Sequence, residues 1–431
     1  MSEVSAVDVS GTVDDRFEAV KAQFEQNFAN GLDVGASVAI IVDGEMVVDL
    51  WGGTITGDDG VEKPWERDTI INVWSTTKTM AALSALVLAD RGELDVDAPV
   101  ATYWPEFAAN GKSDVLVRHL MSHSAGLSGW QEPMTTSDLY DWDKCTSLLA
   151  AQAPWWEPGT QSGYHAITQG YLVGEVVRRV SGATVGQFFA SEIAGPLGAD
   201  FFIGTPASED ARVAYVIPPA VGLAGADEIP HESLLYRTMS NPALDAAASQ
   251  TVPWRRAEIP AAGGHGNARS VATAQSVVSH GGELNGVRLL SQAGIDRIFR
   301  EQTYGPDLIL PATFKLGIGY GLQCPEVPIS PNERACFWGG WGWLAVRQRS
   351  ADQDHVRVCD EPDGRRHHRR HPRWQPAVRR IRRNDPRPLT PTSEVLRSGG
   401  FPTPSGGAQD LHCARPPLRR TSGGALLVEA A

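Results

Sequence analysis

The sequence predicts an α+β fold in which helices flank an antiparallel sheet built from both ends of the chain, beside a mostly helical region. Two stretches rich in strand-forming residues, 35–55 and 315–346, carry this prediction. The long segment between them shows apolar residues at helical spacing instead. Strands from both chain ends with helices between them favour a single layered unit.

The first stretch, GASVAIIVDGEMVVDLWGG at 35–53, predicts two strands joined at Asp43 and Gly44. An Asp-Gly pair between two strand-like runs is a strong hairpin signal. At the other end, KLGIGYGLQC (315–324) and ERACFWGGWGWLAV (333–346) are glycine-rich strand candidates. Glycine within a strand allows another backbone or a ligand to approach closely.

Between and before these strands, apolar spacing predicts helices over residues 16–30, 75–91, 138–152, 169–182 and 267–282. The segment 169–182 closes on Ser-Gly, which is typical of a helix end. We therefore divide the chain into an acidic N-terminal extension (1–15), a domain at 16–346 and a tail at 347–431.

Composition narrows the class of protein. The 431 residues are 42% hydrophobic, which is sufficient for a large core, and the five cysteines form no CxxC pair. Scattered cysteines favour a reducing compartment over a zinc site or a disulfide framework. Residues 1–15 contain no apolar signal segment, and the apolar stretches are too short to cross a bilayer. We expect a cytoplasmic protein that does not act at a membrane.

Charge is unevenly distributed along the chain. Residues 1–346 hold 21 Lys and Arg against 42 Asp and Glu, a formal net charge of −21. Residues 347–431 hold 17 Arg, no Lys and 9 acidic residues, a net charge of +8. An acidic body disfavours nucleic acid as a partner.

A serine and a lysine one helical turn apart, Ser75 and Lys78, open the predicted helix at 75–91. Positions i and i+3 share one helix face, so the lysine can reach the serine hydroxyl. A lysine buried among apolar neighbours loses proton affinity and can act as the base that a weak serine nucleophile needs. A helix N-terminus also offers free backbone N–H groups to an oxyanion. The plain alternative is an N-cap serine followed by a surface lysine.

Two further segments support catalysis. Tyr164 precedes an apolar helix, and it could take or relay a proton if a charged Lys78 held its phenol in a low-pKa form. FWGGWG at 337–342 could bring a backbone N–H to a reacting carbonyl. The alternatives are a half-buried core tyrosine and a glycine-rich turn.

Taken in this order, these segments resemble the β-lactamase-like serine hydrolases, and among them the family VIII carboxylesterases, which are related to class C β-lactamases. The resemblance covers residues 16–346. Besides the serine-lysine pair, it rests on LADRGELDVDAPVATYWP (88–105), YWPEF (103–107), VRHLMSHSAGLSGW (117–130) and WEPGTQSGYHAIT (156–168).

The resemblance implies roles for individual residues. Ser75 would be the acylated nucleophile, with Lys78 and Tyr164 sharing the role of general base. The backbone N–H groups of Ser75 and Trp341 would form the oxyanion hole. Neither a metal nor a cofactor is implied, and the partner would be a small ester.

Substrate contacts are expected from Trp338, Gly339 and Gly340, which stand where β-lactamases carry Lys-Thr-Gly. His165 is added because it follows Tyr164, and Trp130 because tryptophans gather in the family segments. The tryptophans suggest an apolar pocket for the acyl or alcohol group, although core packing explains some of them. These are Trp74, Trp130, Trp155, Trp156, Trp338 and Trp341.

Three departures from the family pattern bear on the substrate. His165 and Ala166 follow Tyr164, so the asparagine of the usual Tyr-x-Asn is missing. Trp338 replaces the lysine that would bind a β-lactam carboxylate, which favours neutral esters over penicillins. Trp343 stands where the family usually continues Gly-Ser.

Other catalytic classes find little support in the sequence. No G-x-S-x-G is present, which argues against an α/β-hydrolase nucleophile. The histidines at 119, 123, 165 and 265 lack metal-ligand spacing, and we interpret each as structural, with His165 also expected to line the site because it neighbours Tyr164.

The tail loses the periodicity of the body after Val346 and turns into runs of Arg, His and Pro. It predicts either a disordered basic arm for an anionic partner or a frameshift near Trp343. The frameshift is considered because a plausible gene sequence for this segment, translated one base out of frame, can encode an apolar strand. On the frameshift interpretation the sheet would lack its last strands, and the edge beside 337–342 would be unpaired.

Several functions remain open alongside the esterase. The same machinery serves an amide hydrolase, a peptidase, a β-lactamase or an acyltransferase. A catalytically silent penicillin-recognising fold would be a binding protein, and the arginine-rich tail would suit a nucleic-acid or anion-binding protein.

Overall fold

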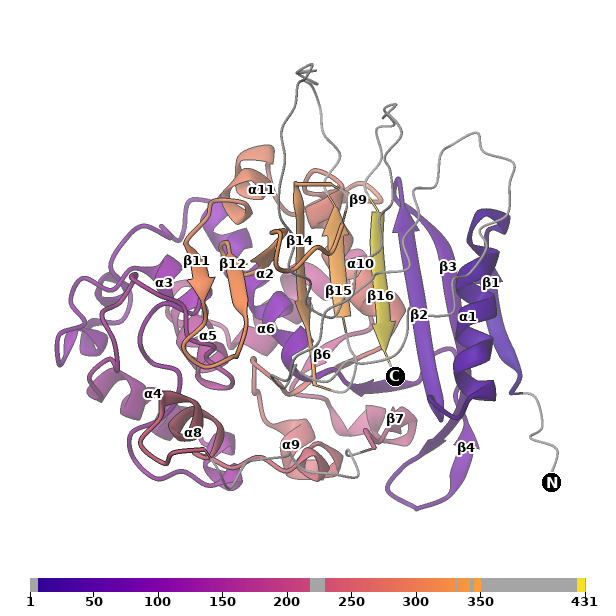
Figure 1. Ribbon diagram of the computed structural model, residues 1–431, viewed down its shortest axis with the longest axis horizontal. Helices are drawn as coiled ribbons and strands as arrows, with labels where there is room; N and C mark the ends of the chain where they lie inside the picture. The colour runs from indigo at the N-terminus through magenta and orange to yellow at the C-terminus, as the bar shows by residue number, and fades with distance from the viewer. Residues whose placement is uncertain (1–6, 218–228, 331, 342–344, 350–424, 431) are drawn as a thin grey trace, which may run out of the picture.

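The computed structural model describes residues 7–217, 229–330, 332–341, 345–349 and 425–430. Its main feature is a ten-stranded antiparallel sheet whose strands come from both ends of the chain (Figure 1). Nine strands follow in spatial order, and β4 (Glu62–Pro64) pairs with β3. The order is β1 (Val9–Val13), β3 (Glu45–Thr56), β2 (Gly35–Val42), β16 (Ala425–Ala430), β15 (Ala345–Arg349), β14 (Ala335–Gly339), β13 (Gly321–Leu322), β12 (Thr313–Leu316) and β11 (Thr303–Pro306).

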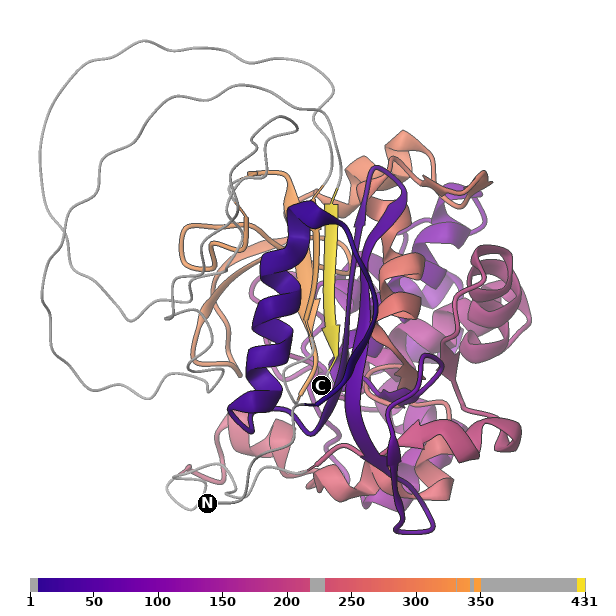
Figure 2. The same cartoon turned by 90° about the vertical axis from the view of Figure 1, so that its right-hand side faces the viewer.

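Helices cover both faces of this sheet. Helix α1 (Glu18–Ala29) lies on one face, where Phe24 and Phe28 pack in a small core with the side chains of β2 and β3. Helix α10 (Ala268–Ser279) packs against β2, β15 and β16. Figure 2 shows α1 on one side of the sheet and the larger helical body on the other. This layered arrangement confirms the predicted β-lactamase-like α+β fold.

The remaining helices build the inserted helical region. They are α2 (Thr77–Asp90), α3 (Val117–Met121), α4 (Trp142–Ala151), α5 (Thr168–Ser181), α6 (Val185–Phe189), α7 (Gly195–Leu197), α8 (Leu234–Met239), α9 (Val252–Arg256) and α11 (Gln292–Ile298). Two small sheets accompany them. One has the order β6 (Phe202–Ile203), β8 (Gly264–Gly266), β5 (Ile70–Asn72) and β7 (Val213–Ala214), and the other pairs β9 (Glu283–Leu284) with β10 (Val287–Arg288). Across the described residues, no helix has both the length and the apolar character that crossing a membrane requires.

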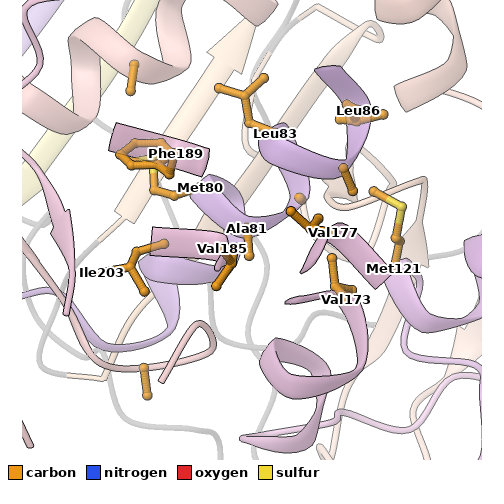
Figure 3. Close-up of a cluster of buried hydrophobic side chains, with 14 of the residues drawn as sticks. Met80, Ala81, Leu83, Leu86, Met121, Val173, Val177, Val185, Phe189 and Ile203 are labelled. Atoms are coloured by element: carbon orange, nitrogen blue, oxygen red, sulfur yellow. The ribbon is translucent and has the colours of Figure 1, made fainter. Parts of the chain in front are cut away.

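Helix α2 is the centre of the core. Its residues from Thr77 to Ala89 are all buried, so this is not the amphipathic helix with one exposed face that the sequence predicted but a helix enclosed on every side. It packs against α5 and α6, and Figure 3 shows Leu83, Leu86 and Met80 of α2 among side chains of those helices. Polar groups between Thr77 and Ala89 are therefore held away from water.

Local chemistry explains the elements that the sequence predicted. Asp43 and Gly44 both have positive φ, 53° and 83°, as the predicted β2–β3 hairpin turn requires. Gly182, with φ 74°, ends α5 in the left-handed conformation. The stretch 315–324 forms two short strands rather than one, because Gly319, with φ 87°, turns the chain between β12 and β13.

Both ends of the chain extend the sheet beyond the expected domain. Strand β1 pairs with β3, so the sheet begins within the segment that we expected to be an N-terminal extension. The edge beside 337–342 is paired, because β14 pairs with β15 and β16 joins β15 to β2. This corrects the expected unpaired edge. Residues 342–344 and 350–424 lie outside the described residues, so the frameshifted or disordered tail stays a prediction.

The central position of α2 predicts a large cost for truncating its side chains. Leu83 is fully buried, so Leu83→Ala should lower the free energy of unfolding by about 2–5 kcal/mol through lost burial and a residual cavity. Urea unfolding measures this. Leu32→Ala is the matched control, because Leu32 is 60% exposed, and it should change stability by less than about 0.5 kcal/mol. Equal effects would show that α2 is not the core helix.

Candidate active site

Ser75 lies in a tight turn between strand β5 and helix α2. Trp74, immediately before it, has a φ of 45°, a left-handed conformation that a bulky side chain rarely adopts. Two contacts hold this turn from the preceding residues: the Val73 N–H donates to the carbonyl of Gly264 at 2.8 Å, and the Trp74 N–H donates to Asn72 Oδ1 at 3.3 Å. The surrounding structure therefore fixes the backbone that presents Ser75.

Thr77 braces the same turn from the helix side. Its hydroxyl donates to the Trp74 carbonyl at 2.6 Å and accepts the Gly264 N–H at 2.9 Å, so one buried side chain ties the turn to β8. A Cβ on Gly264 would lie 2.6 Å from the Thr77 Oγ1, so a glycine is needed here.

The three predicted catalytic side chains meet at the Ser75 hydroxyl. Lys78 Nζ lies 2.9 Å from Ser75 Oγ, and Tyr164 Oη lies 2.5 Å from the same oxygen. Lys78 comes from the first turn of α2, and Tyr164 comes from the segment before α5. Geometry thus brings together the three residues that the sequence proposed, two of them 89 positions apart.

Burial weakens the proton affinity of Lys78. The side chain is 1% exposed, and this burial lowers its pKa well below the ordinary 10.5. Nζ also donates to the carbonyl oxygens of Ala166 at 2.7 Å and Ala261 at 2.9 Å. A neutral amine has two N–H groups and one lone pair, and carbonyl oxygens can only accept. In the neutral amine, the two carbonyls take both N–H groups, and the lone pair is left for Ser75.

Tyr164 differs from our expectation of a low-pKa phenol. Burial raises the pKa of Tyr164 to about 12, although the hydrogen bond with Ser75 opposes the rise. Lys78, whose Nζ lies 5.0 Å from the phenol ring centroid, does not offset this rise. A protonated phenol can donate to Ser75 Oγ, and in that arrangement the serine proton is free for a neutral Lys78.

Three consecutive backbone N–H groups fix Tyr164 in place. The Gly163 N–H donates to the His123 carbonyl at 2.9 Å, and the Tyr164 N–H donates to Asp307 Oδ1 at 3.0 Å. The His165 N–H donates to His123 Nδ1 at 3.1 Å. Tyr164 is thereby held independently of its hydroxyl.

Aromatic rings flank the three catalytic candidates. On one side, the Trp341 ring packs edge-on against Trp74 at 5.0 Å between centroids, and Trp254 lies 5.3 Å from Trp74. Trp341 is 44% exposed, so it borders the solvent next to the residue that precedes Ser75. Trp338 lies 6.1 Å from the Tyr164 ring. Apolar aromatic walls of this kind suit an uncharged ligand.

The remaining predicted contacts divide into two groups. Trp338, Gly339 and Gly340 lie at the end of β14 near Tyr164 and are partly or fully exposed. Trp130 does not face the site: it is 2% exposed, its indole donates to the Cys145 carbonyl, and it packs in the core.

The structure also contradicts the expected substrate contact of His165. Its ring is fully buried, Nδ1 donates to the Gly163 carbonyl at 2.6 Å, and Nε2 accepts the Leu127 N–H at 3.0 Å. Both ring nitrogens are occupied within the protein, so the side chain supports the loop rather than a substrate.

Sequence reasoning missed the supporting residues Asn72, Thr77, His123 and Asp307. Each also contacts backbone groups far away in the chain, Asn72 through the carbonyls of Ala262 and Gly264, and no local pattern reveals such contacts. His123 had one signal, its place in the family-like segment 117–130, but we interpreted it as merely structural. Within the described residues, no three His, Cys, Asp or Glu side chains are grouped so that they could hold a metal ion.

A comparison with known families assigns the class of protein. A model of the beta-lactamase family matches residues 24–354. This match covers more than half of the chain, and the chain therefore belongs to the beta-lactamase family, within the esterase and β-lactamase group of hydrolases.

Individual relatives agree with this assignment. The chain is 38% identical over 321 residues to the protein called esterase/beta-lactamase LipL of Mycobacterium tuberculosis, covering 72% of this chain and 74% of that protein. A solved family VIII carboxylesterase is 42% identical with a TM-score of 0.72, covering 79% of this chain and 90% of the other. A penicillin-binding protein homologue from Caulobacter crescentus is 38% identical with a TM-score of 0.71 and the same coverage.

The buried lysine predicts a pH signature in stability. Between the low folded pKa of Lys78 and the ordinary 10.5, the unfolded chain binds one proton that the folded protein does not. The free energy of unfolding therefore rises with pH in this window, by at most about 1.4 kcal/mol per pH unit. Lys78→Met removes this contribution.

Urea unfolding of both proteins at about pH 7.5 and about pH 9.5 tests this linkage, since both values lie in the expected window. The stability of the wild type relative to Lys78→Met should increase with pH. Lys63→Met is the control, because the Lys63 side chain is 43% exposed, and it should leave the pH slope unchanged. Parallel slopes for wild type and Lys78→Met would mean that Lys78 is charged in the folded state.

Proposed function

We propose that this protein is a serine carboxylesterase that hydrolyses small, short-chain carboxylic esters through an acyl-Ser75 intermediate. The observation that carries the proposal is the Ser75 hydroxyl, which lies 2.9 Å from the buried Lys78 amine and 2.5 Å from the Tyr164 phenol. Acyl transfer requires an activated nucleophile. A neutral amine beside a serine hydroxyl supplies the base that activates the serine.

In acylation, the Lys78 lone pair takes the Ser75 proton while Oγ attacks the ester carbonyl carbon. The backbone N–H groups of Ser75 and Trp341 are proposed to hold the resulting oxyanion. The packing of Trp341 against Trp74 supports this role, because it brings the end of β14 beside the nucleophile. The tetrahedral intermediate then collapses, and the carbon–oxygen bond to the alcohol breaks.

The leaving alkoxide needs a proton, and Tyr164 is placed to supply it. The phenol gives its proton to the alkoxide and recovers one from the Lys78 ammonium, which returns both groups to their neutral forms. In deacylation the same groups act in reverse: water loses a proton to them as it attacks the acyl carbon, and Ser75 Oγ regains a proton as the acid leaves.

Neutral esters are favoured over β-lactams by the residue at 338. An indole ring cannot pair with the carboxylate of a penicillin, whereas aromatic walls accept an uncharged acyl or alcohol group. The relatives named esterase and carboxylesterase support the same choice, although one name also includes beta-lactamase.

The test is active-site labelling combined with a substrate comparison. A fluorophosphonate should add one adduct, mapped to Ser75, and p-nitrophenyl acetate should be hydrolysed faster than nitrocefin or a D-amino-acid amide. Ser75→Ala should lose both the adduct and the activity, whereas Ser208→Ala at an exposed position should keep them. An unlabelled wild-type protein would point to a silent binding protein, and preference for nitrocefin to a β-lactamase.

Tyr164→Phe separates proton transfer from packing. The ring stays in place while the hydroxyl is lost, so kcat/KM for p-nitrophenyl acetate should fall about 10²- to 10³-fold with little change in stability. Tyr304→Phe is the matched control, because Tyr304 is 48% exposed, and it should retain full activity. A Tyr164→Phe variant within about threefold of wild type would leave Lys78 as the sole proton carrier.

A further inference from the structure

His123 has an unusual backbone for a buried side chain. Its φ is 57°, in the left-handed region, and the residue is only 2% exposed. Histidine, asparagine and aspartate enter this region more readily than most residues, but the conformation still has an energetic cost. The surrounding contacts must therefore hold His123 in this conformation.

The same residue holds both backbone neighbours of Tyr164. Its carbonyl accepts the Gly163 N–H at 2.9 Å, and its ring Nδ1 accepts the His165 N–H at 3.1 Å. Burial first, and then the neighbouring His165 and Lys78, lower the pKa of the His123 imidazole well below 6.5, so Nδ1 keeps its lone pair. The left-handed backbone is what lets one residue present both acceptors to the same segment.

The ring of His123 also contacts the opposite end of the chain. It stacks on Trp338 with centroids 5.0 Å apart and planes 15° from parallel, and it lies 5.2 Å from the Tyr164 ring. Trp338 belongs to β14, whereas Tyr164 precedes α5. His123 therefore contacts both the residue proposed to move protons and the residue proposed to face the substrate.

We propose that His123 is a positioning residue that sets Tyr164 through its ring Nδ1 and sets Trp338 through its ring face. The first contact serves the chemical step, and the second serves substrate binding. This inference rests on the proposed esterase function of Ser75, Lys78 and Tyr164.

Two other buried histidines, His165 and His265, differ from His123 in the partner of their ring Nδ1. His165 and His265 each hydrogen-bond through Nδ1 to a carbonyl two residues back in the chain, at Gly163 and Gly263. These Nδ1 contacts stay within one loop, and the second His165 contact, from the Leu127 N–H to Nε2, involves neither Tyr164 nor Trp338. The His123 ring instead joins segments 42 and 215 positions away, both of which border Ser75.

Two substitutions separate the hydrogen bond from the stack. Asparagine places Oδ1 near the position of Nδ1 and tolerates the left-handed backbone, but it has no ring. His123→Asn should therefore keep kcat near the wild-type value and raise KM about 3- to 10-fold through the lost aromatic contact. His123→Ala loses both contacts, and the displaced Tyr164 should lower kcat by about 100-fold.

Steady-state and burst kinetics with p-nitrophenyl acetate measure these parameters, and His231→Asn, at an exposed position, controls for the exchange itself. In a His123→Asn background, Trp338→Ala should raise KM less than it does in the wild type, because the stack is already lost. Thermal unfolding identifies a variant that fails to fold. If His123→Ala does not fold, the kcat and KM of His123→Asn decide the matter.

Clear outcomes would overturn the proposal. A His123→Ala variant with wild-type kcat would contradict the proposal that His123 positions Tyr164. A 100-fold loss of kcat in a folded His123→Asn variant would contradict it as well. An unchanged KM in His123→Asn would contradict the proposal that the stacking of His123 on Trp338 serves substrate binding. Failure of the esterase proposal is distinguishable, because there the wild-type Ser75 itself would not react with the fluorophosphonate.

Discussion

The burial of the Lys78 amine is the constraint on which the rest of the site depends. Taking an ammonium out of water is costly, so burial lowers the pKa of Lys78 and favours the neutral amine, which can act as a base. Its two N–H groups must then be satisfied, and the carbonyls that do so belong to Ala166 and Ala261, 88 and 183 positions away. The helical region must bring three distant segments to one atom, and it can do so because α2 is enclosed on every side.

A second constraint follows from presenting Ser75 to a substrate while Lys78 stays buried. The chain meets it with a strained turn at Trp74, whose left-handed backbone is held by Asn72 and Thr77 on one side and by aromatic packing on the other. Strain of this kind persists only where the surroundings over-determine it, and such places are commonly functional sites. The rigid core behind the turn therefore serves the chemistry in front of it.

Sequence patterns predicted what depends on local order. Helices α2, α5 and α10 and the β2–β3 hairpin follow from apolar periodicity and turn residues, and the pairing of Ser75 with Lys78 follows from helical spacing. Sequence patterns did not predict the direction in which a side chain points or its contacts with residues far away in the chain. His165 adjoins Tyr164 in the chain, yet its ring is locked to Gly163 and Leu127, and His123 acts on residues far along the sequence. The place of β16 between β15 and β2 had no local signal either.

All the pKa shifts around Ser75 favour neutral groups, and this has a chemical consequence. Burial lowers the pKa of Lys78 and of His123 and raises the pKa of Tyr164, so on the proposed mechanism the resting site carries no formal charge. Charge then appears only as the tetrahedral intermediate forms, in surroundings of low dielectric where aligned N–H dipoles stabilise it strongly. An uncharged ester enters such a site without losing a strong hydration shell. A carboxylate-bearing substrate would have to be desolvated against the indole of Trp338, which carries no charge to offset the cost.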